Sequence, residues 1–183
     1  MKELSLHILD IAQNSISAGA NLVTIEIKES ISNDSLEISV IDNGCGMSEE
    51  FAKNVTDPFT TTRTTRKVGM GIPLFKLAAV QAGGDLSLET KQGEGTKITA
   101  VMQHGHIDRS PIGDMAETMV NLVSMNDKID FVYRHCTDDG EHVLDTRQIR
   151  EIMQDVPLSN MSVLAWIRDY VNEGLNEINA KLF

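Results

Sequence analysis

Apolar and polar positions follow a helical period in the first part of the chain. Between residues 4 and 18 the apolar side chains share about half of a helical wheel, whereas His7, Asp10 and Asn14 fall on the other half. Gly19 supplies a natural end for such a helix. The pattern predicts an amphipathic helix with one polar face.

Strict alternation of apolar and polar residues predicts half-buried strands at four places: 22–28, 36–42, 85–90 and 96–102. Helical signals mark two more segments, 48–54 and 72–82, the second with Pro73 near its start. The order helix, two strands, helices, two strands suits a sheet that carries helices on one face. The fold class expected is therefore α+β, a two-layer α/β sandwich.

The pattern changes after residue 103. Helices are expected at 112–125, 145–155 and 159–180, and a hairpin at 129–136 with 141–145. No chemistry is evident in this tail. We therefore divide the chain into a first domain, residues 1–103, and a C-terminal α/β extension, residues 104–183.

Charge and cysteine content narrow the class of protein. The chain has 183 residues with 16 Lys and Arg against 27 Asp and Glu, a formal net charge of -11, which argues against broad binding to nucleic acid or anionic membrane. Two cysteines far apart favour a reduced, cytoplasmic protein. The N-terminus lacks the uninterrupted apolar stretch of a signal peptide, and no apolar run approaches bilayer length.

Chemistry is suggested first by VIDNGCGM (40–47), where an apolar strand runs into Asp42 and then into two glycines. Taken alone, this segment is more typical of a β-hairpin turn than of a site. On the first helix Asp10 and Asn14 are four residues apart, so both project from one face, and a carboxylate beside an amide can support a phosphate-bound Mg²⁺ ion. A merely solvated helix face is the alternative, and His7 reads as a boundary histidine.

VGMGIPL places Gly69 and Gly71 at the entry to a helix, where free N–H groups favour an anion. It is neither a Walker loop, because no G-K-[ST] follows, nor a Rossmann turn, because a loop precedes it. That loop contributes Arg63, Arg66 and Lys67, a small basic cluster suited to covering phosphates. A surface loop without function is the alternative, and GEGT (93–96) needs only to be a hairpin turn.

The order of four motifs resembles the GHKL superfamily of ATP-binding domains, which have the Bergerat-type fold. The motifs are Asn14 in a helix, DNGCGM after a strand, a Thr/Arg loop that leads into GMG, and GEGT before a strand. That superfamily includes sensor histidine kinases, type II topoisomerases, heat-shock chaperone ATPases and MutL repair proteins. DIAQNSISAGA is similar to MutL, whereas PFTTTR and the segment from VGMGIPL to GEGT are closer to histidine-kinase catalytic domains. The resemblance covers residues 4–102.

The resemblance implies an ATP site with Mg²⁺. It assigns Asn14 to the Mg²⁺ ion on the phosphates, and Asp42 to the adenine amino group, which a buried carboxylate distinguishes from guanine. The other implied contacts are Gly44 and Gly46 under the base, Met47 near the adenine, Thr96 supporting Asp42 directly or through water, Gly69 and Gly71 around the phosphates, and Arg63, Arg66 and Lys67 in a lid of residues 55–68. Cys45 is read as a packing residue, not a nucleophile.

Three departures shape the expected activity. Hydrolytic members of the superfamily carry a Glu four residues before the Asn, where this chain has Asp10, so Asp10 is at most a weak general base. Lys67 occupies the position at which other members of the superfamily often have the first glycine of the lid. No helix bearing a phosphoacceptor histidine precedes the domain, and His7 is not read as one.

The first functional hypothesis is an ATP-dependent, histidine- or serine-kinase-like module that phosphorylates or regulates a separate protein in signalling. The second is a nucleotide-dependent switch, related to anti-sigma-factor kinases, with little turnover. A MutL-like ATPase is a poor third because of the acidic charge and the short chain. Residues 104–183 are expected to choose the partner, so that deleting them leaves ATP affinity intact, and the sequence leaves a homodimer open.

Overall fold

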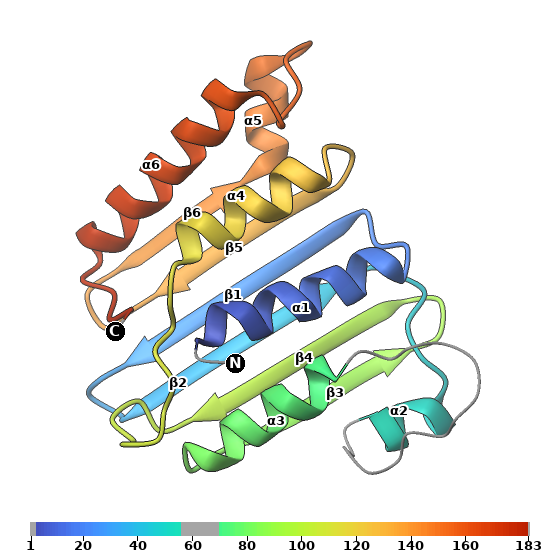
Figure 1. The fold of residues 1–183 in the computed structure, drawn as a ribbon, viewed down its shortest axis with the longest axis vertical. Helices are drawn as coiled ribbons and strands as arrows, with labels where there is room; N and C mark the ends of the chain where they lie inside the picture. The colour runs from blue at the N-terminus through green and yellow to red at the C-terminus, as the bar shows by residue number, and fades with distance from the viewer. Residues whose placement is uncertain (1–2, 56–69, 183) are drawn as a thin grey trace.

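The computed structural model describes residues 3–55 and 70–182 (Figure 1). These residues form the helices α1 Leu4–Ser17, α2 Glu49–Val55, α3 Gly71–Gln81, α4 Met115–Met125, α5 Thr146–Met153 and α6 Met161–Glu177. They form the strands β1 Leu22–Ser30, β2 Ser35–Asp42, β3 Asp85–Lys91, β4 Gly95–Met102, β5 Asp130–Cys136 and β6 Glu141–Asp145. The helices and strands expected from the sequence pattern are all found, with ends that differ by a few residues.

The strands form one mixed sheet. Its order is β3-β4-β2-β1-β5-β6, in which β1 and β5 run parallel and every other neighbouring pair runs antiparallel. The antiparallel register of β1 and β2 sets Val23 opposite Asp42 and Ile25 opposite Val40. The expected α+β class with a mixed, open sheet is therefore confirmed.

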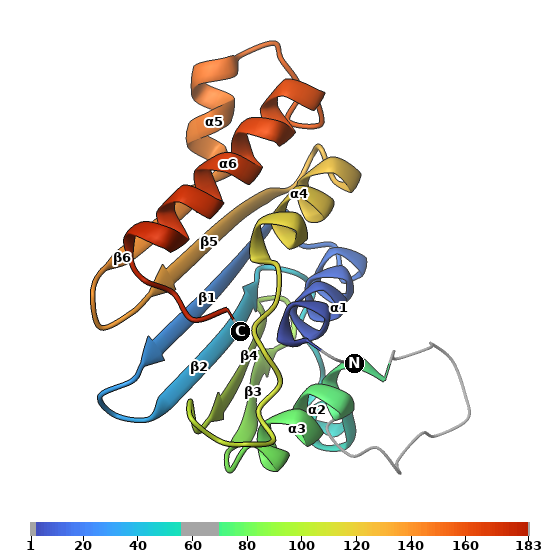
Figure 2. The same ribbon diagram turned by 60° about the vertical axis from the view of Figure 1, so that its left-hand side comes forward.

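Helices cover the apolar face of this sheet. On β1 the side chains of Val23, Ile25 and Ile27 are fully buried, and the residues between them are partly or fully exposed, as the period of two requires. Helices α1, α3 and α4 lie over that buried face, and they stand clear on one side of the sheet in the turned view (Figure 2). Asp42, at the end of β2, therefore lies at one end of a two-layer structure.

Helix α1 is held at both ends by backbone contacts. The N–H groups of Leu4 and Ser5 donate to the carbonyls of Pro111 and Ile112, at 2.9 and 2.8 Å, so a distant segment satisfies donors that a helix start leaves free. At the other end the chain turns out of the helix at Gly19, whose φ of +79° favours glycine. No helix within the described residues is long and apolar enough to cross a bilayer.

Residues 104–182 continue the sheet rather than starting a new one. Strand β5 pairs with β1 along its length, and α4 packs against α1 and α6, so one core spans both parts of the chain. The division at residue 103 stays a prediction, but it runs through a shared core.

A buried carboxylate joins the same parts. Glu29 accepts hydrogen bonds from His135 Nε2 at 2.5 Å, from His104 Nε2 at 3.0 Å and from the backbone N–H of Lys181 at 3.2 Å. Burial opposes ionisation of Glu29, but the hydrogen bonds from His135 and His104 outweigh it and lower the pKa of this carboxyl. The contact ties β1 to β5, to the segment after β4 and to the C-terminal residues.

Candidate functional site

Asp42 ends β2 on the helix-covered face, and both of its carboxylate oxygens are held. Oδ2 accepts a hydrogen bond of 2.6 Å from Ser15 Oγ on α1, and Oδ1 accepts one of 2.9 Å from the backbone N–H of Gly44. Each oxygen keeps a further lone pair, so the group can still accept from a ligand. The two bonds fix the plane of a carboxylate that is 9% exposed.

The segment after Asp42 is pinned to its surroundings and does not form a hairpin turn. Cys45 donates its N–H to the carbonyl of Ala18 at 2.9 Å and accepts from the N–H of Gly93 at 2.8 Å. The Met47 N–H donates to Thr90 Oγ1 at 2.9 Å. This loop therefore spans the gap between the end of α1 and the turn that joins β3 to β4.

Glycines are required in this loop and in the neighbouring turn. Gly46 has a φ of +63°, and a Cβ there would overlap the carbonyl of Lys91. Gly95 has a φ of +112°, and a Cβ there would overlap the carbonyl of Asp42. At Gly44 a Cβ would lie 3.0 Å from the Ala18 carbonyl and from Asp42 Oδ1. The glycines therefore let three backbone segments approach one another closely beside Asp42.

Thr96 lies opposite Asp42 in the register of β2 and β4. Its hydroxyl is 3.1 Å from Thr90 Oγ1, and the described donors to Asp42 are Ser15 and Gly44 instead. Ser15 was not singled out by the sequence patterns. The signal that could have found it is its position next to Asn14 on the inward side of an amphipathic helix.

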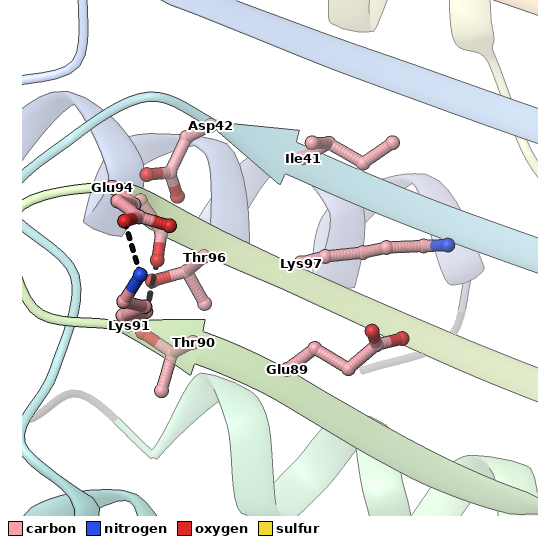
Figure 3. A pocket seen from close by; sticks show the side chains of 9 residues that line it. Ile41, Asp42, Glu89, Thr90, Lys91, Glu94, Thr96 and Lys97 are labelled. Atoms are coloured by element: carbon pink, nitrogen blue, oxygen red, sulfur yellow. Dashed lines mark hydrogen bonds and ion pairs between the residues drawn. The ribbon is translucent and has the colours of Figure 1, made fainter.

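A hollow of about 330 Å³ opens beside Asp42 and Thr96 (Figure 3). Lys91, the last residue of β3, forms an ion pair with Glu94 on the following turn, and both line the same hollow as Asp42 (Figure 3). The hollow is lined by Ile41, Asp42, Glu89, Thr90, Lys91, Glu94, Gly95, Thr96 and Lys97. Asp42 and Thr96 therefore line one open hollow at the end of the sheet, which also reaches Ile41 and Lys97 at the alternate, more exposed positions of β2 and β4.

The expected phosphate-side residues lie at the contact of α1 with α3. Asp10 and Gly71 line a second hollow of about 480 Å³ between these helices. Asn14 lies one turn after Asp10, and its Nδ2 is buried without a hydrogen-bond partner among the described residues. Asn14 adjoins Ser15, so α1 connects the phosphate-side group to the Asp42 group.

Four expected site residues, Arg63, Arg66, Lys67 and Gly69, lie outside the described residues, as does almost all of the expected lid. Val55, its first residue, ends α2 and is buried. Met47 is partly buried and packs against the core.

His7 is not the boundary histidine that the helical wheel suggests. It is 2% exposed and stacks on Phe75 of α3, with ring centroids 5.3 Å apart and the ring planes at 14°. Burial lowers the pKa of His7 to about 4, so the imidazole is neutral at pH 7. The wheel placed it among polar residues because it cannot show that α3 covers this side of α1.

Residues 2–106 match the family described as histidine kinase-, DNA gyrase B-, and HSP90-like ATPase. The signal transduction histidine-protein kinase AtoS of Escherichia coli (strain K12) is 32% identical over 103 residues, which cover 56% of this chain and 16% of that protein. Sporulation kinase E of Bacillus subtilis (strain 168) is 31% identical over 97 residues, which cover 52% of this chain and 13% of that protein. The match thus spans less than a fifth of these relatives.

Among solved structures, the N-terminal domain of a DNA repair protein shares the fold, with a TM-score of 0.51 at 17% identity, covering 79% of this chain and 53% of that one. The family match covers more than half of the chain and confirms the resemblance that the four motifs carry. The chain belongs to the histidine kinase-, DNA gyrase B- and HSP90-like ATPase family.

Proposed function

We propose that the chain binds ATP with Mg²⁺ and phosphorylates or regulates a separate protein. The observation that carries the nucleotide part is the carboxylate of Asp42, which is buried and held in a fixed orientation by Ser15 and Gly44. A fixed carboxylate accepts from the amino group of adenine but repels the carbonyl oxygen that guanine presents at the same position. Gly44 and Gly46 let the loop pack closely against Ala18 and Lys91, which holds the backbone around Asp42 in place for the base.

Asn14 fits the phosphate end of such a ligand. Its buried Nδ2 has no partner among the described residues, and a buried amide donor of this kind is stabilised by an anionic acceptor. Its oxygen suits a hard divalent cation. Mg²⁺ bound there would neutralise phosphate charge, and the start of α3 lies at the hollow that Asp10 and Gly71 line.

The histidines of the described residues do not favour phosphate transfer within this part of the chain. All five lie in the described residues: His7, His135 and His142 are buried, His104 bonds Glu29, and His106 Nδ1 accepts from the N–H of Asp108. None is an exposed, unengaged imidazole. The relatives named above are kinases, which agrees with transfer to a protein.

Calorimetric titration with ATP and with GTP, both with Mg²⁺, tests the nucleotide part. Asp42→Asn replaces an acceptor oxygen by a donor, so ATP affinity should fall by about tenfold or more. Asp169→Asn, an exposed change on α6 with the same effect on net charge, should leave it unchanged. Unaltered ATP binding by Asp42→Asn, or equal affinity for GTP, contradicts the assignment.

Transfer is tested by incubating the protein with γ-labelled ATP and candidate partner proteins. Acid-labile label on a partner indicates phosphohistidine, whereas acid-stable label indicates Ser or Thr. A nucleotide-dependent switch is the second candidate, favoured because Asp10 is shorter than a Glu and one of its carboxylate oxygens packs on the backbone of Gly71. Partner binding that requires ATP but proceeds without any labelled product supports the switch.

A further inference from the structure

The Asp10 carboxylate lies against the first residue of α3. A Cβ added to Gly71 would overlap Asp10 Oδ2 and would stand 2.9 Å from Asp10 Cγ. Asp10 therefore touches the Gly71 backbone in van der Waals contact, and only glycine leaves space for it. Both residues also line the hollow between α1 and α3.

The start of α3 has no other anion among the described residues. Its N-cap residue, Met70, makes no side-chain capping bond, and its first turn contains no acidic side chain. Pro73 lacks an N–H, and no described residue accepts from the N–H of Gly71 or Ile72. The helix dipole favours a negative charge at this point, and the Asp10 carboxylate lies beside it without accepting a hydrogen bond from these N–H groups.

We propose that Asp10 sets the affinity of the nucleotide site by acting as an internal anion at the start of α3. The inference rests on the proposed function, in which the phosphates of ATP approach this helix start. The Asp10 carboxylate would repel the negative charge of a phosphate bound there unless the side chain moved away. Asp10 thus weakens phosphate binding while it stabilises the protein without nucleotide.

This role differs from that of a general base, which must contact the water that it activates. The packing of Asp10 Oδ2 on Gly71 points the carboxylate at backbone instead. It also differs from a Mg²⁺ ligand, whose loss would weaken ATP binding. The sign of the change in ATP affinity on removing the charge therefore separates the three roles.

Asp10→Asn removes the charge and keeps the shape, and its affinity for ATP with Mg²⁺ should rise by roughly three- to tenfold in calorimetric titration. Without nucleotide, its thermal midpoint should fall by a few degrees, because the helix start loses its anion. A residue with a purely structural role would lower the midpoint without tightening ATP binding. Asp10→Ser, shorter and neutral, repeats the measurement if Asp10→Asn fails to fold.

Two variants control for charge. Asp169→Asn, exposed on α6, changes the net charge equally and should bind ATP as the unmodified chain does. Asp10→Glu keeps the charge and should not bind ATP more tightly.

Weaker or equal ATP binding by Asp10→Asn overturns the inference. If the unmodified chain binds ATP and Asp42→Asn does not, such a result leaves the proposed function standing and removes only the role of Asp10. If the unmodified chain does not bind ATP at all, the proposed function fails and the inference falls with it.

Discussion

At the scale of single residues, the orientation of Asp42 depends on Ser15. Ser15→Ala should remove the 2.6 Å bond to a buried carboxylate and destabilise the fold by about 1.5–3 kcal/mol. ATP affinity should fall several-fold, because the carboxylate loses one of two contacts that fix its plane. Urea unfolding and calorimetry measure the two effects. Ser17→Ala, which removes a bond on the exposed side of α1, is the control and should change neither by much.

His7 should make the fold sensitive to mild acid. Its folded pKa, about 4, lies below the ordinary value of 6.5, so the unfolded chain binds the proton more readily and stability falls as pH drops from 6.5 towards 4. Between pH 7 and pH 5 the loss from this residue should reach about 2 kcal/mol. His7→Leu should lose less stability than the unmodified chain over this interval in urea unfolding. Equal losses in both proteins would show that His7 is not the source.

The sequence pointed to Asp42 but not to Ser15, and it misplaced His7. DNGCGM carries its own chemistry, a carboxylate followed by glycines, within six adjacent residues. The partners of Asp42 and His7 come from other elements, and a helical wheel records which positions are polar without recording what packs over them.

At the scale of elements, the loop after Asp42 connects α1 to the turn between β3 and β4. Its glycines are therefore needed for the packing of the fold as well as for the site. Gly46→Ala adds a side chain at a positive φ and against the Lys91 carbonyl. It should destabilise the fold by more than ~2 kcal/mol, because the backbone strain at Gly46 adds to the cost of moving the Lys91 carbonyl. ATP binding should weaken as well. Thermal unfolding and calorimetry measure these effects.

Gly93→Ala is the matched control in the turn between β3 and β4. Gly93 also has a positive φ, +84°, but a Cβ there meets nothing within 4 Å. Its substitution should cost only backbone strain, about 1 kcal/mol, with ATP affinity little changed. Similar losses in both variants would show that backbone strain, and not the close approach at Gly46, sets the cost.

Elements were predictable where periodicity was strong. The alternation in 22–28 is what β1 shows, whereas in β2 the three successive residues Ile38, Ser39 and Val40 are all buried. The parallel pairing of β1 with β5 was not predictable, because a strand's alternation says which face is buried but not which distant strand lies beside it. The sequence therefore suggested an appended tail where the structure shows a continued sheet.

At the scale of the whole molecule, the C-terminal residues support the candidate site from a distance. Helix α1 carries Asp10, Asn14 and Ser15, and its first N–H groups are satisfied by carbonyls at 111 and 112. Nearly half of the buried apolar residues belong to the part after residue 103, and they form one cluster with the rest. The choice of a partner by residues 104–183 remains a proposal. The described residues of this segment also complete the core and hold the start of α1.

A fragment of residues 1–103 should consequently fail to fold alone, in contrast to the expectation that deletion leaves ATP affinity intact. Removing residues after 103 turns β1 into an edge strand and takes α4 away from α1, and the loss of apolar burial exceeds the stability of an ordinary domain. Circular dichroism and ATP titration of the fragment measure the outcome. Adding a separately produced fragment 104–183 should restore both signals, because the missing strand and helix cap return. A fragment 1–103 that folds and binds ATP unaided would instead establish it as an independent domain.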